Sequence, residues 1–404
     1  MQKKLIALAI ASALSAPAFA DNANVTFYGK VDVDFESVST DNPNGTNANV
    51  NPFTVTPASA NPSRITRVAT NASRLGIKGS EDIGGGLNAI YQYEVQMDAN
   101  GNGGNGLGNG TRNSGVGLEG GFGKVVIGIW DTPYKLSHNK VELFDNTHFA
   151  SATNLIGRSA ATTTVNAGAP LPATGTTGTA AAQSFVTRLK QSVQYSSPNF
   201  GGFDVKVAYG TDMAPTGANA AGAGGVATNV AQDKRTLSVA ATFEQEMFYV
   251  ALANETATDA AINGTAKGNN SASRLVGAFK FGDAGFVGLT VEQMKITDAG
   301  AIANTVESHT RKGYELAGSY KIAEHRFGAS YAKMGDLGTY ADTGATQISL
   351  RYGYNFSKRT EAYAMYSKLT NKKYGQYNFS AGNTIVSSAG ASMSGFGVGI
   401  AHSF

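Results

Sequence analysis

The sequence predicts an all-β protein, folded as a transmembrane antiparallel β-barrel of about sixteen strands. Three observations predict this fold class. Segments in which apolar and polar residues alternate recur from residue 25 to the end of the chain, with no helical periodicity between them. The 50 glycines follow no collagen-like period and suit a chain with many turns. Short and long connections alternate, which is typical of barrels with short periplasmic turns and long external loops.

The first twenty residues have the features of an export signal. Lys3 and Lys4 precede an apolar run at residues 5–14, and Ala18-Phe19-Ala20 has the small-x-small pattern of a cleavage site. The apolar run is too short to span a bilayer. We therefore expect a signal peptide over residues 1–20 and one barrel domain over residues 21–404.

Composition restricts what the remaining chain can be. It holds no apolar run of the length that a spanning helix needs, so any insertion into a membrane must use strands. Cysteine is absent, which excludes disulfides and thiolate metal sites. The chain has 32 basic and 29 acidic residues. When Lys3 and Lys4 of the signal are subtracted, the basic residues exceed the acidic ones by one, and this balance gives no argument for nucleic-acid binding.

The segment Val25–Glu36 is the clearest strand. Its odd positions are apolar or glycine, and its even positions are polar or tyrosine. Strict alternation places the two sets on opposite faces of a strand. Strands of a soluble sandwich also alternate, but they run shorter. Twelve alternating residues are enough for a tilted strand that crosses a bilayer.

The same pattern predicts the other strands in chain order. They lie near Ser73–Ser80, Leu87–Asp98, Arg112–Gly120, Lys124–Trp130, Arg188–Ser196, Phe203–Gly210, Lys234–Phe243, Met247–Asn254, Arg274–Phe281, Phe286–Ile296, Gly313–Ile322, Arg326–Met334, Thr346–Phe356, Thr360–Leu369 and Ser394–Phe404. Long polar loops are expected near Ser39–Asn71, Ala99–Thr111, Asp131–Thr187, Thr211–Asp233, Thr256–Ser271, Thr297–Arg311, Gly335–Ala345 and Thr370–Met393.

The final strand predicts how the barrel closes. Every second residue from Phe396 to Phe404 lies on one face, and the chain ends on this aromatic residue. A sheet in lipid leaves no edge unpaired, so we expect this strand to pair with Val25–Glu36. Phe404 is therefore the residue that we expect to serve barrel closure and assembly.

The longest segment without periodicity runs from Asp131 to Thr187. A compact domain rarely contains a structureless loop of this length unless the loop is functional or disordered. We expect it to be the third external loop, to fold into the lumen and to set the bore of a pore.

The sequence resembles the general porins of the neisserial and β-proteobacterial type. The resemblance rests on VTFYGKVDVDFE at 25–36, ASRLGIKGSEDIGGGLNAIYQYE at 72–94, GLEGGFGKVVIG at 117–128, QSVQYSSPNFGGF at 191–203, YNFSKRTEAYAMYS at 354–367 and the C-terminal GIAHSF. It implies a sixteen-stranded trimeric barrel with an aqueous pore and a third loop folded inward as the constriction.

In that family, inward arginines of the barrel wall face acidic residues of the third loop. The resemblance implies that the wall positions are Arg74, Arg112 and Arg188, with Lys190 on the same face as Arg188. Strand parity points Arg74 and Arg188 inward. Arg112 shares its parity with Val116, so it faces the lumen only if a β-bulge shifts the register.

Three acidic residues of the loop are the candidates to face those bases: Asp131, Glu142 and Asp145. We expect one or two of them to do so and the others to cap turns. Where relatives usually carry an arginine, this chain reads Gly128-Ile129-Trp130, so one wall charge is missing. Further charged residues with lumen parity are Lys30, Lys78, Arg274, Lys280, Lys321, Arg351, Asp32, Asp34, Glu36, Glu94, Asp98, Asp204, Glu292 and Glu315.

The predicted function is passive transport of ions and small hydrophilic solutes through a weakly anion-selective, water-filled pore in the outer membrane of a Gram-negative bacterium. The resemblance implies a homotrimer that contacts outer-membrane lipid and lipopolysaccharide and is inserted by the barrel-assembly machinery. The alternatives are a solute-specific porin-like channel and a plugged structural or adhesive barrel.

An enzyme is not expected, because no nucleophile and base stand out as a pair. The five histidines show no metal-ligand spacing in the sequence. We therefore expect no cofactor, no metal and no nucleic-acid partner.

Overall fold

The computed structural model describes residues 24–41, 63–100, 107–144, 149–159, 162–163, 179–180, 183–213, 233–263, 266–299, 306–379 and 389–404. The predicted signal peptide, residues 1–20, lies outside them. The main strands are β1 (Asn24–Thr40), β2 (Arg64–Thr70), β3 (Arg74–Gly84), β4 (Leu87–Met97), β5 (Leu107–Thr111), β6 (Ser114–Gly120), β7 (Gly123–Asp131), β12 (Arg188–Ser196), β13 (Phe203–Met213), β14 (Asp233–Glu244), β15 (Phe248–Asn263), β16 (Ala266–Lys280), β17 (Gly285–Ala299), β18 (Val306–Ile322), β19 (His325–Met334), β20 (Ala345–Asn355), β21 (Thr360–Asn371) and β22 (Ser392–Ser403).

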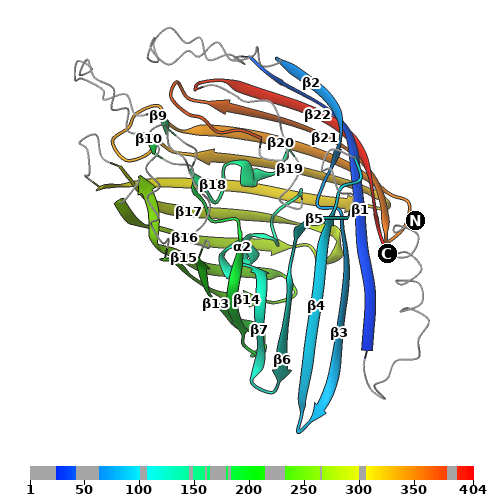
Figure 1. Ribbon diagram of the computed structural model, residues 1–404. Helices are drawn as coiled ribbons and strands as arrows, with labels where there is room; N and C mark the ends of the chain where they lie inside the picture. Colours follow the sequence, from blue (N-terminus) through cyan, green and yellow to red (C-terminus); the bar gives the residue numbers. More distant parts are fainter. Residues whose placement is uncertain are drawn as a thin grey trace, which may run out of the picture.

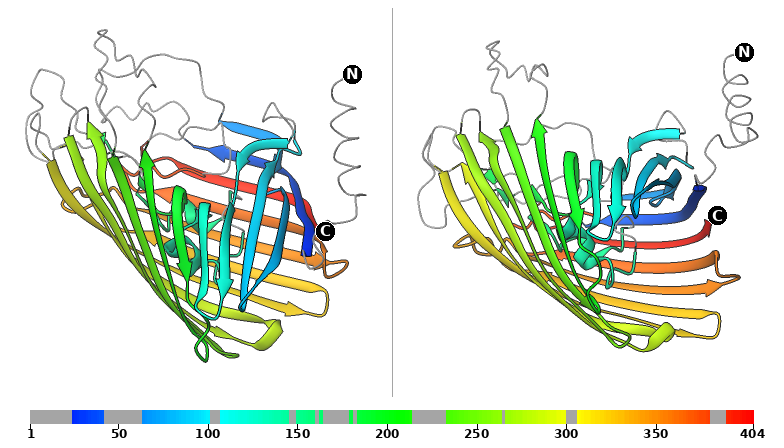
Figure 2. Two further views of the ribbon diagram at one scale, coloured as in Figure 1. Left: turned by 60° about the horizontal axis from the view of Figure 1, so that its bottom comes forward. Right: turned by 90° about the horizontal axis from the view of Figure 1, so that it is seen from below.

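These segments form one antiparallel sheet that closes on itself (Figures 1 and 2). The sheet has 18 segments, but β2 and β3 both pair with β1, and β5 and β6 both pair with β4. β2 and β3 are therefore two parts of one interrupted strand, and so are β5 and β6. The barrel has 16 strands, as predicted. β1 pairs with β22 from Lys30↔Ser403 to Thr40↔Met393, which confirms the predicted closure.

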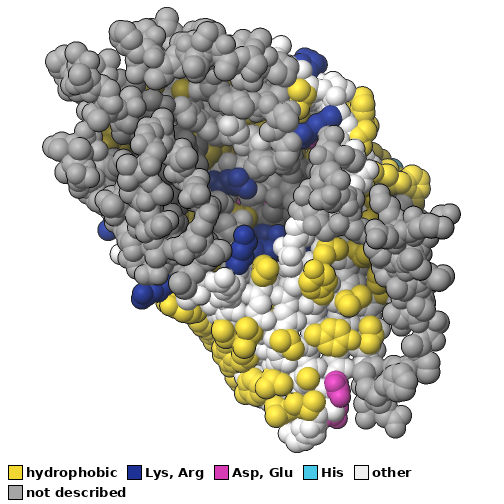
Figure 3. All heavy atoms as spheres, viewed as in Figure 1, with side chains coloured by type: hydrophobic (Ala, Val, Ile, Leu, Met, Phe, Trp, Pro, Cys, Tyr) yellow, Lys and Arg dark blue, Asp and Glu magenta, His cyan; other side chains and the backbone are white. Residues whose placement is uncertain are grey.

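Alternation along the strands turns apolar side chains outward and polar side chains inward. On β1, Phe35 is 57% exposed, whereas Asp34 and Glu36 on the other face are buried. Figure 3 shows hydrophobic side chains spread over the outer wall. In this protein exposed apolar side chains form the band that faces lipid. Among the described residues, no helix is long and apolar enough to span a membrane.

The predicted loop bounds were wrong at four places on the external rim. The affected loops are those expected at Ser39–Asn71, Ala99–Thr111, Thr256–Ser271 and Thr297–Arg311. The structure has strands in all four: β2 lies inside the first loop, β5 inside the second, and β15 and β16 extend into the third and β17 and β18 into the fourth. Beyond the lipid-facing band both faces of a strand meet water, so the apolar alternation ends while the backbone hydrogen bonds continue.

Described residues between β7 and β12 fold into the inside of the barrel (Figure 2). We call the described residues of 131–187 the lumen loop. It contains helix α2 (Pro133–His138), the 3-10 turn η1 (Ala152–Asn154) and four two-residue strands, β8 (Arg158–Ser159), β9 (Thr162–Thr163), β10 (Thr179–Ala180) and β11 (Gln183–Ser184). The lumen loop is thus not structureless. A second 3-10 turn, η2 (Gly282–Ala284), lies outside it, between β16 and β17.

Hydrogen bonds join the lumen loop to opposite parts of the wall. Near its start, the Tyr134 amide donates to the Ser238 hydroxyl of β14 at 3.0 Å. Further on, the Gln347 side-chain amide of β20 donates to the Phe149 carbonyl at 3.3 Å. The loop therefore crosses the lumen, because β14 and β20 lie on different sides of the barrel (Figure 1).

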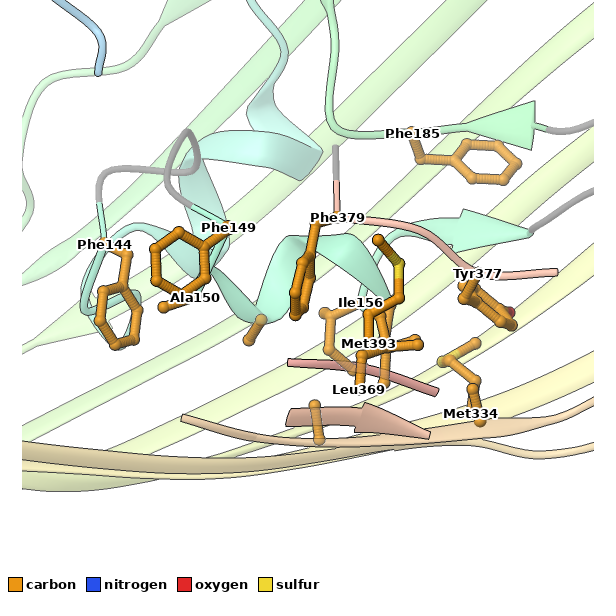
Figure 4. Packing of buried hydrophobic residues seen from close by; sticks show 14 of the residues in the cluster. Phe144, Phe149, Ala150, Ile156, Phe185, Met334, Leu369, Tyr377, Phe379 and Met393 are labelled. Carbon is orange, nitrogen blue, oxygen red and sulfur yellow. The ribbon is translucent and has the colours of Figure 1, made fainter. Parts of the chain in front are cut away.

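A buried apolar cluster holds the far part of the loop (Figure 4). Phe144, Phe149 and Ile156 of the loop are almost completely buried against side chains of the inner wall, including Leu369 of β21 and Met393 of β22. The wall makes room for this cluster with glycine. A Cβ at Gly395 would lie 2.6 Å from the Phe149 ring, so the ring packs directly on the β22 backbone.

Candidate functional site

The lumen loop turns inward through one short helix. The Thr132 hydroxyl caps α2 by accepting a hydrogen bond from the Lys135 amide at 3.1 Å. Pro133 stands in the first turn, where its missing N–H has no helical partner to lose. A helix of six residues is not stable alone, so its position depends on contacts with the wall.

One wall carboxylate fixes the loop at its centre. Glu292 of β17 accepts hydrogen bonds from the Tyr134 hydroxyl at 2.9 Å and from the Gly157 amide at 2.7 Å, both in the loop. Its charge is balanced by Arg274 of β16, whose Nη2 lies 2.8 Å from Oε2. The guanidinium also stacks over the Tyr134 ring at 4.1 Å. This buried group holds two separate parts of the loop on one point of the wall.

Five of the predicted constriction residues line one lumen cavity of about 470 Å³. They are Arg74, Arg112 and Arg188 from the wall, Asp131 from the end of β7, and Glu142 from the loop. Lys135 of α2 and Glu94 of β4 line the same space. We call it the Arg74 cavity. It has basic and acidic groups on its surface and lies beside the loop that crosses the barrel.

The wall arginines are paired mainly with residues of the wall itself. Glu94 forms ion pairs with two of them: its Oε1 lies 2.5 Å from Arg112 Nε, and its Oε2 lies 3.9 Å from Arg74 Nε. Asp131 Oδ1 lies 3.1 Å from Arg188 Nε and 2.7 Å from Lys135 Nζ. Of the three candidate loop acids, Asp131 is the one that contacts a wall arginine in the described structure.

The bulge that Arg112 required is present. β4 pairs Val95 with Thr111 on one side of Arg112 and Gln92 with Gly115 on the other, so one extra residue enters between β5 and β6. The extra residue shifts the register and brings Arg112 onto the face of Glu94.

The remaining candidates have different positions. Lys190 is exposed at a β-bulge between Leu189 and Ser192, and the lining of the Arg74 cavity does not include it. Asp145 lies outside the described residues. Phe404 exchanges two backbone hydrogen bonds with Gly29, at 3.0 and 3.1 Å, and so extends the β1–β22 ladder to the last residue.

Two further lumen cavities lie nearer the short turns. One, of about 330 Å³, is lined by the charged residues Lys30, Arg326, Arg351, Lys358, Arg359, Asp32, Glu142 and Glu361. The other, of about 260 Å³, is lined by Lys78, Lys124, Glu119 and Trp130 among others. In all three cavities basic residues outnumber acidic ones, by one or two charges. Figure 3 shows lysine and arginine side chains inside the central hollow of the barrel.

Sequence reasoning missed Lys135 and Asn113. Asn113 accepts from Arg188 at 3.2 Å and donates to Asp131 at 3.1 Å, so it orients that ion pair. The sequence analysis predicted no helix here, although Thr132-Pro133 is a helix-start signal that could have located α2. Lys135 would then follow four residues after Asp131 on the same face. Asn113 carries no comparable signal, because it enters the site through the bulge.

Comparison with known proteins agrees with this architecture. A family profile for Gram-negative porins matches residues 7–374. Outer membrane porin protein 32 of Delftia acidovorans is 29% identical over 421 aligned positions, which cover 100% of each chain. Major outer membrane protein P.IB of Neisseria sicca is 31% identical over 52% of this chain and 47% of its own length. An anion-selective porin from Comamonas acidovorans has a similar solved structure, with a TM-score of 0.70 at 23% identity over 95% of this chain and 100% of its own.

Proposed function

Because this chain belongs to the Gram-negative porin family, and so is a passive diffusion porin of the outer membrane, we propose that the Arg74 cavity is its constriction and favours anions weakly. The family and the fold point to a channel rather than an enzyme. We propose in addition that this chain has no catalytic activity of its own.

The observation that carries the proposal is the position of the lumen loop. It crosses a closed barrel beside a charged cavity of about 470 Å³, and water-filled cavities with charged linings select ions by sign. Basic residues exceed acidic ones in each of the three lumen cavities, which supports a preference for anions. Because acids are interspersed with bases throughout, the preference is expected to be weak.

Planar-bilayer recording tests this function. Purified protein is expected to give large ohmic current steps, in groups of three if the channel is a homotrimer. A solute-specific channel would instead be blocked by its preferred solute, and a plugged barrel would give no steps. Absence of steps from correctly folded protein would contradict the proposal.

Charge reversal at Arg74 tests the place of the constriction. Arg74→Glu changes the local charge by two units, worth roughly 0.8 kcal/mol at about 10 Å in water and roughly 0.3 kcal/mol after screening over one Debye length. We expect the ratio of cation to anion permeability to rise about two- to threefold. The reversal potential in a salt gradient measures this ratio.

Arg235→Glu is the matched control, because Arg235 is exposed on β14 away from the lumen face. It is expected to leave the reversal potential unchanged. If Arg74→Glu also left it unchanged, Arg74 would not lie at the narrowest part of the pore.

The remaining parts of the proposal concern assembly. We propose that residues 1–20 are removed as a signal peptide, that the barrel-assembly machinery inserts the chain, and that three copies associate among outer-membrane lipid and lipopolysaccharide. The exchange of hydrogen bonds between Phe404 and Gly29 supports a role for the terminal residue in closing the barrel.

A further inference from the structure

Two side chains of the lumen loop meet one side chain of the barrel wall that is far away in the sequence. His138 is the last residue of α2, Glu142 follows one turn later, and Glu315 comes from β18 of the wall. His138 Nε2 lies 2.5 Å from Glu315 Oε2, and His138 Nδ1 lies 3.9 Å from Glu142 Oε2. One nitrogen or oxygen from each residue falls within 4.8 Å of the others.

These groups are buried but incompletely bonded. At most 2% of each side chain is exposed. No hydrogen-bond partner reaches His138 Nδ1, Glu142 Oε2 or Glu315 Oε1 within the described structure. Buried polar atoms are almost always satisfied, so three unsatisfied atoms within one cluster indicate a missing partner.

The charges of the cluster point to the sign of that partner. Arg274 and Glu292 neutralise each other next to it, which leaves two carboxylates around one imidazole. Buried charges that are not paired with a protein group commonly coordinate metals.

We propose that His138, Glu142 and Glu315 form a binding site for one divalent cation of the zinc class, which joins the lumen loop to β18. An imidazole favours zinc and similar transition ions over calcium and magnesium, which prefer oxygen ligands. Zinc takes histidine nitrogen and glutamate oxygen at about 2.0–2.1 Å in tetrahedral sites, with a fourth position open to water. In such a tetrahedral site two ligand atoms lie roughly 3.3 Å apart. The candidate ligand atoms of the cluster lie at most 4.8 Å apart, so they need to approach by no more than about 1.5 Å.

The surroundings support such a site. The Phe144 amide donates to Glu142 Oε1 at 2.9 Å, which orients that carboxylate and leaves Oε2 for the ion. Glu142 also lines both the Arg74 cavity and the cavity that contains Arg351. An ion therefore has a short path from the water of the lumen to the cluster.

The sequence alone could not reveal this site. His138 and Glu142 have the i, i+4 spacing of two ligands on one helical face, but that pair is common without a metal. Glu315 lies 177 positions from His138. Only the inward fold of the loop brings the third ligand into place.

Zinc titration calorimetry on the whole detergent-solubilised protein, refolded after chelator treatment, tests the proposal independently of transport. We expect one Zn²⁺ per chain. Loss of a group that only orients a metal ligand weakens metal binding roughly 10–100-fold. His138→Ala and Glu315→Gln each remove a ligand itself, so each should weaken Zn²⁺ binding by at least that factor. His325→Ala is the matched control, because His325 stacks with Tyr352 at the short-turn rim, and it should bind Zn²⁺ as the unaltered protein does.

Three results would overturn the site. They are no Zn²⁺ binding by the unaltered protein, equal binding by Glu315→Gln, and Ca²⁺ binding at the same site as tightly as Zn²⁺. If His138→Ala fails to form a barrel by circular dichroism, the isosteric Glu315→Gln decides the question alone.

Discussion

Glu292→Gln is expected to release the lumen loop from the barrel wall. The substitution keeps the size of the side chain but removes the charge that balances Arg274 and weakens the bonds from Tyr134 and Gly157. Breaking a buried ion pair by changing one partner costs about 3–5 kcal/mol, because the other charge stays buried. Arg274 and Glu292 lie opposite each other on β16 and β17, whose backbone pairing runs from Ser271↔Lys295 to Lys280↔Phe286. We therefore expect the barrel to stay closed while the loop loses its attachment.

Single-channel recording measures the result. A loop that detaches for part of the time should turn steady current steps into fluctuating ones, and it should become accessible to proteases. Steady currents with the same conductance as the unaltered protein would show that Glu292 does not hold the loop.

Glu244→Gln is the matched control for this experiment. Glu244 also contacts the loop, through Lys140 Nζ at 2.9 Å, but its side chain is 35% exposed. Exposed ion pairs contribute about 0–1 kcal/mol. The same chemical change should therefore leave the current steady, so that burial rather than contact with the loop explains the difference.

The sequence predicted the barrel well because lipid imposes a simple rule on it. Every strand that crosses the membrane must show one apolar face, so residues such as Phe35 and Leu252 mark both the strand and its orientation. The rule applies only where a strand faces lipid. Strands β15 and β16 continue past it with polar residues on both faces, and the sequence there reads as loop.

The candidate site was predictable in part. Parity and resemblance identified Arg74 and Arg188, and the bulge at Arg112 could be stated as a requirement. The pairing of charges could not be predicted. Arg112 pairs with Glu94, a wall residue, whereas Glu142 turns toward His138. Such pairing depends on where a long loop rests, and contacts between residues far apart in the sequence decide that.

Phe149→Ala is expected to loosen the far end of the loop as strongly as Glu292→Gln loosens its centre. Phe149 is completely buried, with its ring 5.6 Å from that of Phe379. Removing a buried phenylalanine side chain costs about 3–5 kcal/mol through lost burial and the cavity left behind. We expect fluctuating single-channel currents here too. The exposed Phe200, at a short turn, provides the control Phe200→Ala, which should leave the current steady.

A change on the opposite side of the same contact separates packing from other effects of the substitution. Gly395→Ala would place a Cβ 2.6 Å from the Phe149 ring, a distance that forces the ring or the strand to move. It alters neither the charge nor the composition of the loop, yet it should also produce fluctuating currents. If Phe149→Ala and Gly395→Ala both gave steady currents, the apolar cluster would not be what holds the loop across the lumen. The buried polar contacts between the loop and the wall would then carry that role, chiefly those of Tyr134 and Gly157 with Glu292 and of His138 with Glu315.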